Sequence, residues 1–159
     1  MTRQAIEMVK FCLVAALMAL PTLGHAADIL TVNAHGAAES FSMEELQEMP
    51  QTTVVTKNDY VETTTTFVGP KLRDVLAGQD IGPESELIMT ALNDFTVRAP
   101  ASDAYEHDVI LALSMDGKPM SIRDKGPIWV IYPMDDEPKL RDDIYNGRLV
   151  WQLKSIAVE

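Results

Sequence analysis

Cysteine is nearly absent from this chain of 159 residues. The single one, Cys12, lies in an apolar stretch near the start of the sequence. Disulfides, catalytic thiols, iron–sulfur clusters and thiolate-bound zinc all require cysteine. A domain that begins after this stretch therefore has none of these features. Its stability must come from its hydrophobic core, for which a domain of this size is long enough.

Basic residues are also scarce. The chain has 13 lysines and arginines against 24 aspartates and glutamates, which gives a net charge of −11. Such a chain repels the phosphates of nucleic acids and of anionic lipids, so we expect no nucleic-acid partner. Two explanations of the acidity stay open. It can keep the protein in solution, or it can attract a basic partner or a cation.

A hydrophobic run long enough to cross a membrane is missing. The longest run, residues 11–20, has ten apolar residues, whereas a bilayer requires about 20. Basic residues precede this run and small residues follow it, which is typical of a secretory signal peptide. We predict a signal peptide over residues 1–26 and a single periplasmic domain over residues 27–159, not inserted in the membrane after cleavage. The alternative is a short buried helix.

Strand patterns dominate the predicted domain. β-branched and alternating segments separated by Asn, Asp, Gly and Pro indicate about eight short strands, and helical spacing is confined to short stretches. The main predicted strands cover residues 29–34, 52–57, 61–68, 87–92, 95–99, 109–115, 128–132 and 149–158. With two or three short helices, this predicts an α+β domain that is largely β.

Three local signals are the sharpest in the sequence. Asp116 and Gly117 between apolar runs predict a tight hairpin turn. Residues 128–132 are five apolar residues in succession, which predicts a strand buried on both faces. Ser42 and Glu45 have the spacing of a capping box, which predicts a helix that begins there.

Catalytic motifs are absent from the sequence. It has no nucleophile elbow, P-loop, paired-histidine zinc motif or dinucleotide fingerprint. The acidic groups at residues 135–137 and 142–143 could hold a hard cation or could form a solvated loop. Several cations lie near predicted strand ends, and those that converge would form an anion pocket. They are Arg98, Arg123, Lys125, Arg141 and Arg148.

Motifs in a fixed order connect the chain with a known family. Residues 67–76, FVGPKLRDVL, are similar to an aromatic–x–Gly–x–x–Leu–x–x–Leu–Leu segment. An Asp-aromatic strand, a Leu-Ala hairpin, a Gly-x-Pro strand and a late Trp strand follow at residues 93–97, 110–120, 126–133 and 151–156. This order resembles the sulfite-oxidase-type molybdopterin-binding domain over about residues 50–158. The resemblance implies the mixed-sheet, largely β fold of that family in a small, stand-alone exported form.

The resemblance also indicates where a cofactor would be held. The family binds molybdenum through a cysteine that would fall near Thr56. Two cofactor-contacting cations of the family would fall at Trp129 and Val150. A neutral hydroxyl does not replace a thiolate as a soft ligand. Molybdopterin is therefore implied by the resemblance alone, and we expect no cofactor.

These observations leave two functions open. The first is an exported, non-catalytic domain that binds a small anionic ligand, or an accessory or sensory protein that binds a periplasmic or receptor protein. Its site would be the former cofactor cleft, lined by Arg98, Arg123, Trp129 and Tyr132. The alternative is a genuine molybdopterin-dependent oxidoreductase that holds its cofactor without a cysteine ligand. Whether the protein is an enzyme is left open by the sequence.

Overall fold

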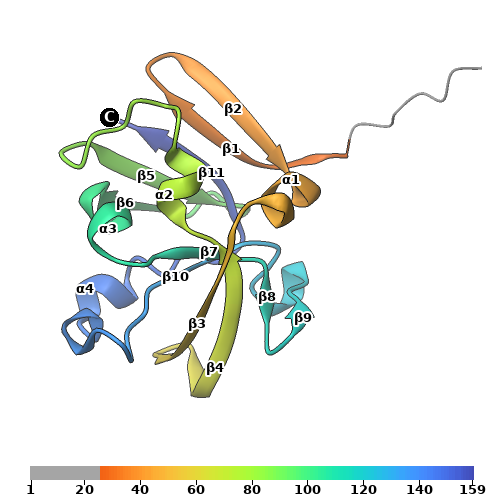
Figure 1. The fold of residues 1–159 in the computed structure, drawn as a ribbon, viewed down its shortest axis with the longest axis vertical. Helices are drawn as coiled ribbons and strands as arrows, with labels where there is room; N and C mark the ends of the chain where they lie inside the picture. Colours follow the sequence, from red (N-terminus) through yellow and green to blue (C-terminus); the bar gives the residue numbers. More distant parts are fainter. Residues whose placement is uncertain (1–25) are drawn as a thin grey trace, which may run out of the picture.

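Three β-sheets and four short α-helices make up the domain (Figure 1). The computed structural model describes residues 26–159. The predicted signal peptide therefore lies outside the described residues, apart from its last position. The α+β, largely β class predicted from the strand patterns is confirmed.

The largest sheet has five strands in the order β2-β1-β11-β5-β6. Its strands β1 and β11 pair in parallel, and the other pairs are antiparallel, so the sheet is mixed. The first and last strands of the domain are thus neighbours. The strands are β1 (Asp28–Ala34), β2 (Ala37–Ser42), β5 (Glu86–Ala91), β6 (Thr96–Pro100) and β11 (Leu153–Val158).

The second sheet has the order β3-β4-β8-β9 and contains the long β3–β4 hairpin, which extends downward in Figure 1. Its strands are β3 (Gln51–Asn58), β4 (Val61–Pro70), β8 (Ser114–Met115) and β9 (Lys118–Pro119). Asp116 and Gly117 join β8 to β9 with φ values of 48° and 75°. The predicted Asp-Gly turn is confirmed, because both residues have the positive φ that such a turn needs.

A two-stranded sheet of β7 (Ile110–Ala112) and β10 (Trp129–Ile131) lies in the middle of the molecule. Successive side chains of a strand point to opposite faces. Leu111 and Val130 accordingly belong to one buried cluster, and Ile110, Trp129 and Ile131 belong to a second one. All five residues at 128–132 are buried, which confirms the predicted two-sided burial.

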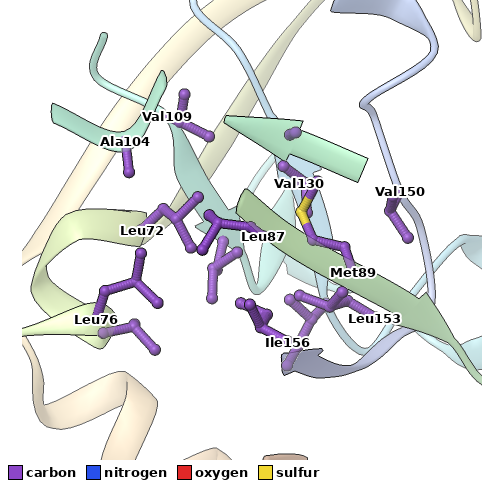
Figure 2. Packing of buried hydrophobic residues seen from close by; sticks show 14 of the residues in the cluster. Leu72, Leu76, Leu87, Met89, Ala104, Val109, Val130, Val150, Leu153 and Ile156 are labelled. Carbon is purple, nitrogen blue, oxygen red and sulfur yellow. The ribbon is translucent and has the colours of Figure 1, made fainter. Parts of the chain in front are cut away.

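The larger cluster fills the space between the five-stranded sheet, β10 and the helix α2 (Figure 2). Leu72 and Leu76 of α2 lie close to Leu87 of β5, and Met89, Leu153 and Ile156 continue the cluster along the sheet. These side chains are at most 1% exposed. Burying one such leucine contributes about 1.5–3 kcal/mol, so this cluster can stabilise a domain that has no disulfide.

The helices are shorter and more numerous than the predicted two or three. They are α1 (Met43–Glu48), α2 (Leu72–Leu76), α3 (Ser102–Glu106) and α4 (Asp143–Asn146), with 3-10 turns η1 (Ile122–Asp124) and η2 (Pro138–Leu140). The capping box of α1 is confirmed: the Glu45 amide donates to the Ser42 hydroxyl, and the Ser42 amide donates to the Glu45 carboxylate. One-turn helices such as α4 contain too few apolar residues to show a helical period.

Two predicted strands are shorter in the structure. The strand predicted at 109–115 divides into β7 and β8, because the chain leaves β10 and pairs with β4. The strand predicted at 149–158 begins at Leu153. Gln152 has a φ of 53°, and its side chain donates to the Ile122 carbonyl at 2.7 Å, so the chain turns before β11.

A glycine allows β4 and β7 to approach each other. A Cβ atom on Gly69 would lie 1.9 Å from the Leu111 carbonyl oxygen, a distance that no side chain tolerates. This close approach places the β3–β4 hairpin against the central strands. Within residues 26–159, no helix is long and apolar enough to cross a membrane.

Candidate functional site

The end of the β3–β4 hairpin is joined to the segment that follows β10. Thr56 is fully buried, and its hydroxyl accepts a hydrogen bond from the Asp135 amide at 3.1 Å and donates to the Lys57 carbonyl at 3.2 Å. The Lys57 amide in turn donates to the Asp135 carboxylate at 3.1 Å. Thr56, near which the resemblance places the family's cysteine, therefore holds two chain segments together.

A cavity of about 410 Å³ lies beside this junction, and we call it the hairpin pocket. It is lined by Lys57, Asn58, Asp59, Thr64, Met134, Asp135, Arg141 and Asn146. Its volume lies within the range of small-molecule sites, roughly 300–1,000 Å³. Two cations and two carboxylates are present, so the lining is balanced in formal charge.

The carboxylate of Asp135 is already satisfied. Arg141 donates from Nη2 to Asp135 Oδ1 at 2.7 Å and from Nε to the Met134 carbonyl at 3.1 Å. With the Lys57 amide on its other oxygen, Asp135 acts as a support for Arg141. A guanidinium has five N–H donors, and these bonds occupy two of them among the described residues. Arg141 therefore keeps donors for a ligand.

Asn58 has an unpaired donor. Its side chain lines the hairpin pocket and the residue is 8% exposed, with Oδ1 accepting the Tyr60 amide at 2.9 Å. That bond fixes which end of the amide is oxygen. Nδ2 is buried and has no hydrogen-bond partner among residues 26–159. An unsatisfied buried donor costs about 1–3 kcal/mol, so an acceptor supplied by a ligand would be stabilised here.

Asn146 connects the hairpin to α4. Its Oδ1 accepts from the Asp59 amide at 3.3 Å, and its Nδ2 donates to the Asp142 carbonyl at 3.4 Å. Asn146 also lines a second cavity of about 340 Å³, which we call the aromatic pocket. The aromatic pocket is lined by Tyr60, Ala91, Asn93, Phe95, Asn146, Gly147, Leu149, Val150 and Trp151. The two cavities therefore adjoin at one side chain.

Two of the predicted site residues are part of the core. Trp129 is fully buried, its indole N–H donates to the Leu149 carbonyl at 3.1 Å, and its ring meets Phe67 edge to face at 5.3 Å. Tyr132 is 1% exposed and donates its hydroxyl to Asp103 at 2.7 Å. They belong to different hydrophobic clusters, so they do not form one wall.

Tyr132 belongs to a buried polar group. Asp103 accepts from Tyr132 and, at 2.6 Å, from Arg148, whose guanidinium also lies 5.1 Å from the centre of the Tyr145 ring. Burial, and then the negative charge of Asp103, raise the pKa of the Tyr132 phenol well above its usual value. The phenol therefore stays protonated and serves as a structural donor.

The two predicted arginines lie elsewhere on the surface. Arg98 is on β6 and forms ion pairs with Glu86 and Glu159; its hydrogen bonds to Glu159 and Glu86 raise the guanidinium pKa. Arg123 is exposed on η1. Neither pocket is lined by any of the four predicted residues. The structure does not bring the four together, and a ligand contact by any of them stays a prediction.

Sequence reasoning missed several residues of the hairpin pocket. Asn58 and Asp59 were recognisable as a turn between two β-branched runs, but nothing local indicated that they line a cavity. Of the five cations near predicted strand ends, only Arg141 lines the hairpin pocket. The acidic groups form no metal site: among the described residues, no three His, Cys, Asp or Glu side chains are grouped to hold an ion.

Comparisons with known proteins agree with the fold. A family model described as "Oxidoreductase molybdopterin binding domain" matches residues 22–135. The sulfane dehydrogenase SoxCD from Paracoccus pantotrophus superposes with a TM-score of 0.59 at 17% sequence identity, covering 81% of this chain and 37% of that chain. This chain thus spans little more than a third of that protein's length. No curated protein matches the sequence.

The residues present do not fit a cysteine-bound molybdenum cofactor. Residues 26–159 contain no cysteine, and the hydroxyl of Thr56 is engaged as both donor and acceptor in protein hydrogen bonds. A thiolate is a soft metal ligand, and a neutral hydroxyl does not replace it. Trp129 and Val150, the positions at which the resemblance implies cations in the family, are buried in the core.

Proposed function

This chain belongs to the oxidoreductase molybdopterin-binding domain family, and we propose its function from the residues that line its hairpin pocket. It is an exported, non-catalytic domain that binds a small anionic ligand in the hairpin pocket and acts as an accessory or sensory protein. The structure has a cavity at the hairpin, and residues 26–159 contain no cysteine through which molybdenum could be bound.

The observation that carries this proposal is the state of Thr56. The hydroxyl that stands near the family's metal ligand is fully buried and bonded to Asp135 and Lys57. Its single O–H and one of its two lone pairs are used in these bonds, and a neutral hydroxyl does not replace a thiolate as a soft metal ligand. This use of Thr56 as a link between two segments supports a role without a redox centre.

The anionic nature of the ligand follows from the donors of the hairpin pocket. Lys57 is exposed, Arg141 keeps free N–H groups, and Asn58 Nδ2 lacks an acceptor. Charge-assisted hydrogen bonds to an oxyanion are about twice as strong as neutral ones. Asp135 is paired with Arg141 at 2.7 Å, which reduces its repulsion of such a ligand; Asp59 is the second carboxylate of the lining.

The sensory role rests on the charge of the whole chain and on the predicted signal peptide. A chain as acidic as this one, with a net charge of −11 over its 159 residues, attracts a basic surface on a receptor domain. Such docking weakens as salt screens the charges. Binding to a receptor ectodomain that persists at 1 M salt would contradict electrostatic docking.

The test is the cofactor content of protein purified from its native host. We expect molybdenum well below one atom per chain by elemental analysis and no pterin fluorescence. Binding of small carboxylates should weaken in Lys57→Gln and Arg141→Gln, whereas Lys139→Gln, which removes an exposed cation outside both pockets, should leave it unchanged. Stoichiometric molybdenum would overturn the proposal.

The second candidate is an oxidoreductase that holds molybdopterin without a cysteine ligand. The family match over residues 22–135 favours it. This candidate requires cofactor on the native protein and turnover with an artificial electron acceptor. A protein that carries neither molybdenum nor pterin and shows no turnover excludes it.

A further inference from the structure

The aromatic pocket has a composition that differs from the rest of this acidic chain. All nine of its lining residues are uncharged, although 23% of the chain is charged. Tyr60 and Trp151 meet edge to face with ring centres 4.9 Å apart and an interplanar angle of 77°. Both rings line the cavity, so it has two aromatic side chains in contact with each other in its wall.

Large apolar groups at this pocket are left in contact with water. Phe95 is 59% exposed and Tyr60 is 40% exposed, and both line the cavity. Burying aromatic surface against another ring is favourable, both through the area removed from water and through ring–ring contact. The pocket is therefore suited to a planar apolar group.

The hairpin pocket adds a polar end to this site. Asn146 lines both cavities, and Tyr60 follows Asn58 and Asp59 along the same turn. In the hairpin pocket, the unpaired Asn58 Nδ2, the exposed Lys57 and the supported Arg141 provide hydrogen-bond donors, two of them cationic. The aromatic pocket, which shares Asn146, is lined by uncharged residues only.

We propose that the two pockets bind one ligand, a small carboxylic acid that carries a planar ring. Its carboxylate accepts from Lys57, Arg141 and Asn58 Nδ2, and its ring lies against Tyr60, Phe95 and Trp151. This inference rests on the proposed anion site in the hairpin pocket and names the class of anion. The requirement for a ring comes from the aromatic pocket alone, so an experiment can disprove it without disproving the anion site.

Three probe compounds separate the contributions of ring and carboxylate. Phenylacetate has both groups, acetate has only the carboxylate, and benzyl alcohol has only the ring. Binding to the full-length mature protein is measured by calorimetry, by amide NMR shifts and by the fluorescence of Trp151. We expect phenylacetate to bind roughly tenfold or more tightly than either other compound, equivalent to about 1.4 kcal/mol.

Substitutions test which side chains bind the ring and which bind the carboxylate, with a control residue of equal exposure. Phe95→Ser should weaken phenylacetate binding several-fold and leave acetate unchanged. Ile122→Ser is the control, because Ile122 is also 59% exposed and lines neither pocket. Lys57→Gln should weaken phenylacetate and acetate alike and leave benzyl alcohol unchanged.

Two results would overturn this inference and leave the proposed function standing. One is acetate that binds as tightly as phenylacetate, and the other is a Phe95→Ser variant that binds phenylacetate as the parent does. Absence of binding by all three compounds overturns both this inference and the anion site on which it rests. Stoichiometric molybdenum in the native protein overturns the proposed function by itself.

Discussion

At the scale of single residues, three buried polar side chains differ in whether their hydrogen-bonding groups have partners within the protein. Thr56, Asn58 and Tyr132 are all at most 8% exposed, yet they differ in their partners. Thr56 and Tyr132 have their hydroxyl groups bonded within the protein, so they stabilise it. Asn58 has a donor that the described part of the chain leaves without an acceptor. Of the donor groups of these three side chains, the Asn58 amide is the one that a ligand acceptor would satisfy.

Tyr132 gives a prediction about pH. Its phenol pKa is raised by burial and by Asp103, so the folded protein keeps a proton that the unfolded chain loses above about pH 10. The contribution of Tyr132 is full below pH 10 and falls as pH rises toward the raised folded pKa. We expect Tyr132→Phe to lower the free energy of unfolding by about 1–2 kcal/mol at pH 7, with a smaller difference at pH 11.

Urea unfolding at several pH values measures this difference. Tyr105→Phe is the control, because Tyr105 is 38% exposed and donates to a backbone carbonyl and not to a carboxylate. A Tyr132→Phe difference that stays constant from pH 7 to pH 11 would contradict the raised pKa.

At the scale of elements, a close contact with the central strands fixes the position of the β3–β4 hairpin. The hairpin itself follows from local sequence, because two β-branched runs flank Asn58 and Asp59, and the structure confirms it as β3 and β4. Its contact with the central strands depends on the missing side chain at Gly69, which faces the Leu111 carbonyl. Without this approach, neither the hairpin pocket nor the bond between Thr56 and Asp135 would form.

Gly69→Ala should therefore destabilise the domain strongly. The added Cβ would lie 1.9 Å from a backbone oxygen, which cannot move aside as a flexible side chain can. We expect a loss of about 3 kcal/mol, the upper end of typical overpacking costs, measured by urea unfolding. Gly147→Ala is the matched control, since Gly147 has φ −65° and only ordinary contacts at 3.4 Å. Equal effects of the two substitutions would contradict the steric account.

At the scale of the whole molecule, the excess negative charge affects the stability of the fold and the kind of partner it attracts. The excess of acidic over basic residues creates repulsion within the folded domain, and the ion pairs between described residues, most of them at the surface, offset only part of it. The same charge directs the protein toward basic partners. Added salt should therefore stabilise this protein, whereas it would destabilise a protein held together by surface ion pairs.

We predict that raising NaCl from 10 mM to 150 mM at pH 7 increases the Tm by about 3–6 °C, or roughly 1 kcal/mol. The reason is that salt screens repulsion among the excess carboxylates. Thermal unfolding at pH 5, near the sequence pI of about 4.6, is the control, because the net charge there is small. A Tm that falls with salt at pH 7 would show that the surface ion pairs outweigh the repulsion.

Local sequence determined much of this protein. The Asp116-Gly117 turn, the capping box at Ser42 and the buried strand at residues 128–132 were predictable, because each depends on residues close together in the chain. The order of such segments was sufficient to indicate the family and its largely β fold. The hydrophobic alternation of a strand fixes its faces before any partner is known.

Tertiary structure alone decided the site. Thr56 and Asp135 are 79 residues apart, and Asp59 and Asn146 are 87 residues apart, yet their bonds build the hairpin pocket. Arg98, Arg123, Trp129 and Tyr132 had the right chemistry for a cleft, but in the structure Trp129 and Tyr132 are buried, Arg98 is ion-paired and Arg123 is exposed on η1, so they are not brought together. The reason is physical: residue type fixes which bonds a side chain can make, and long-range packing fixes which of them it makes.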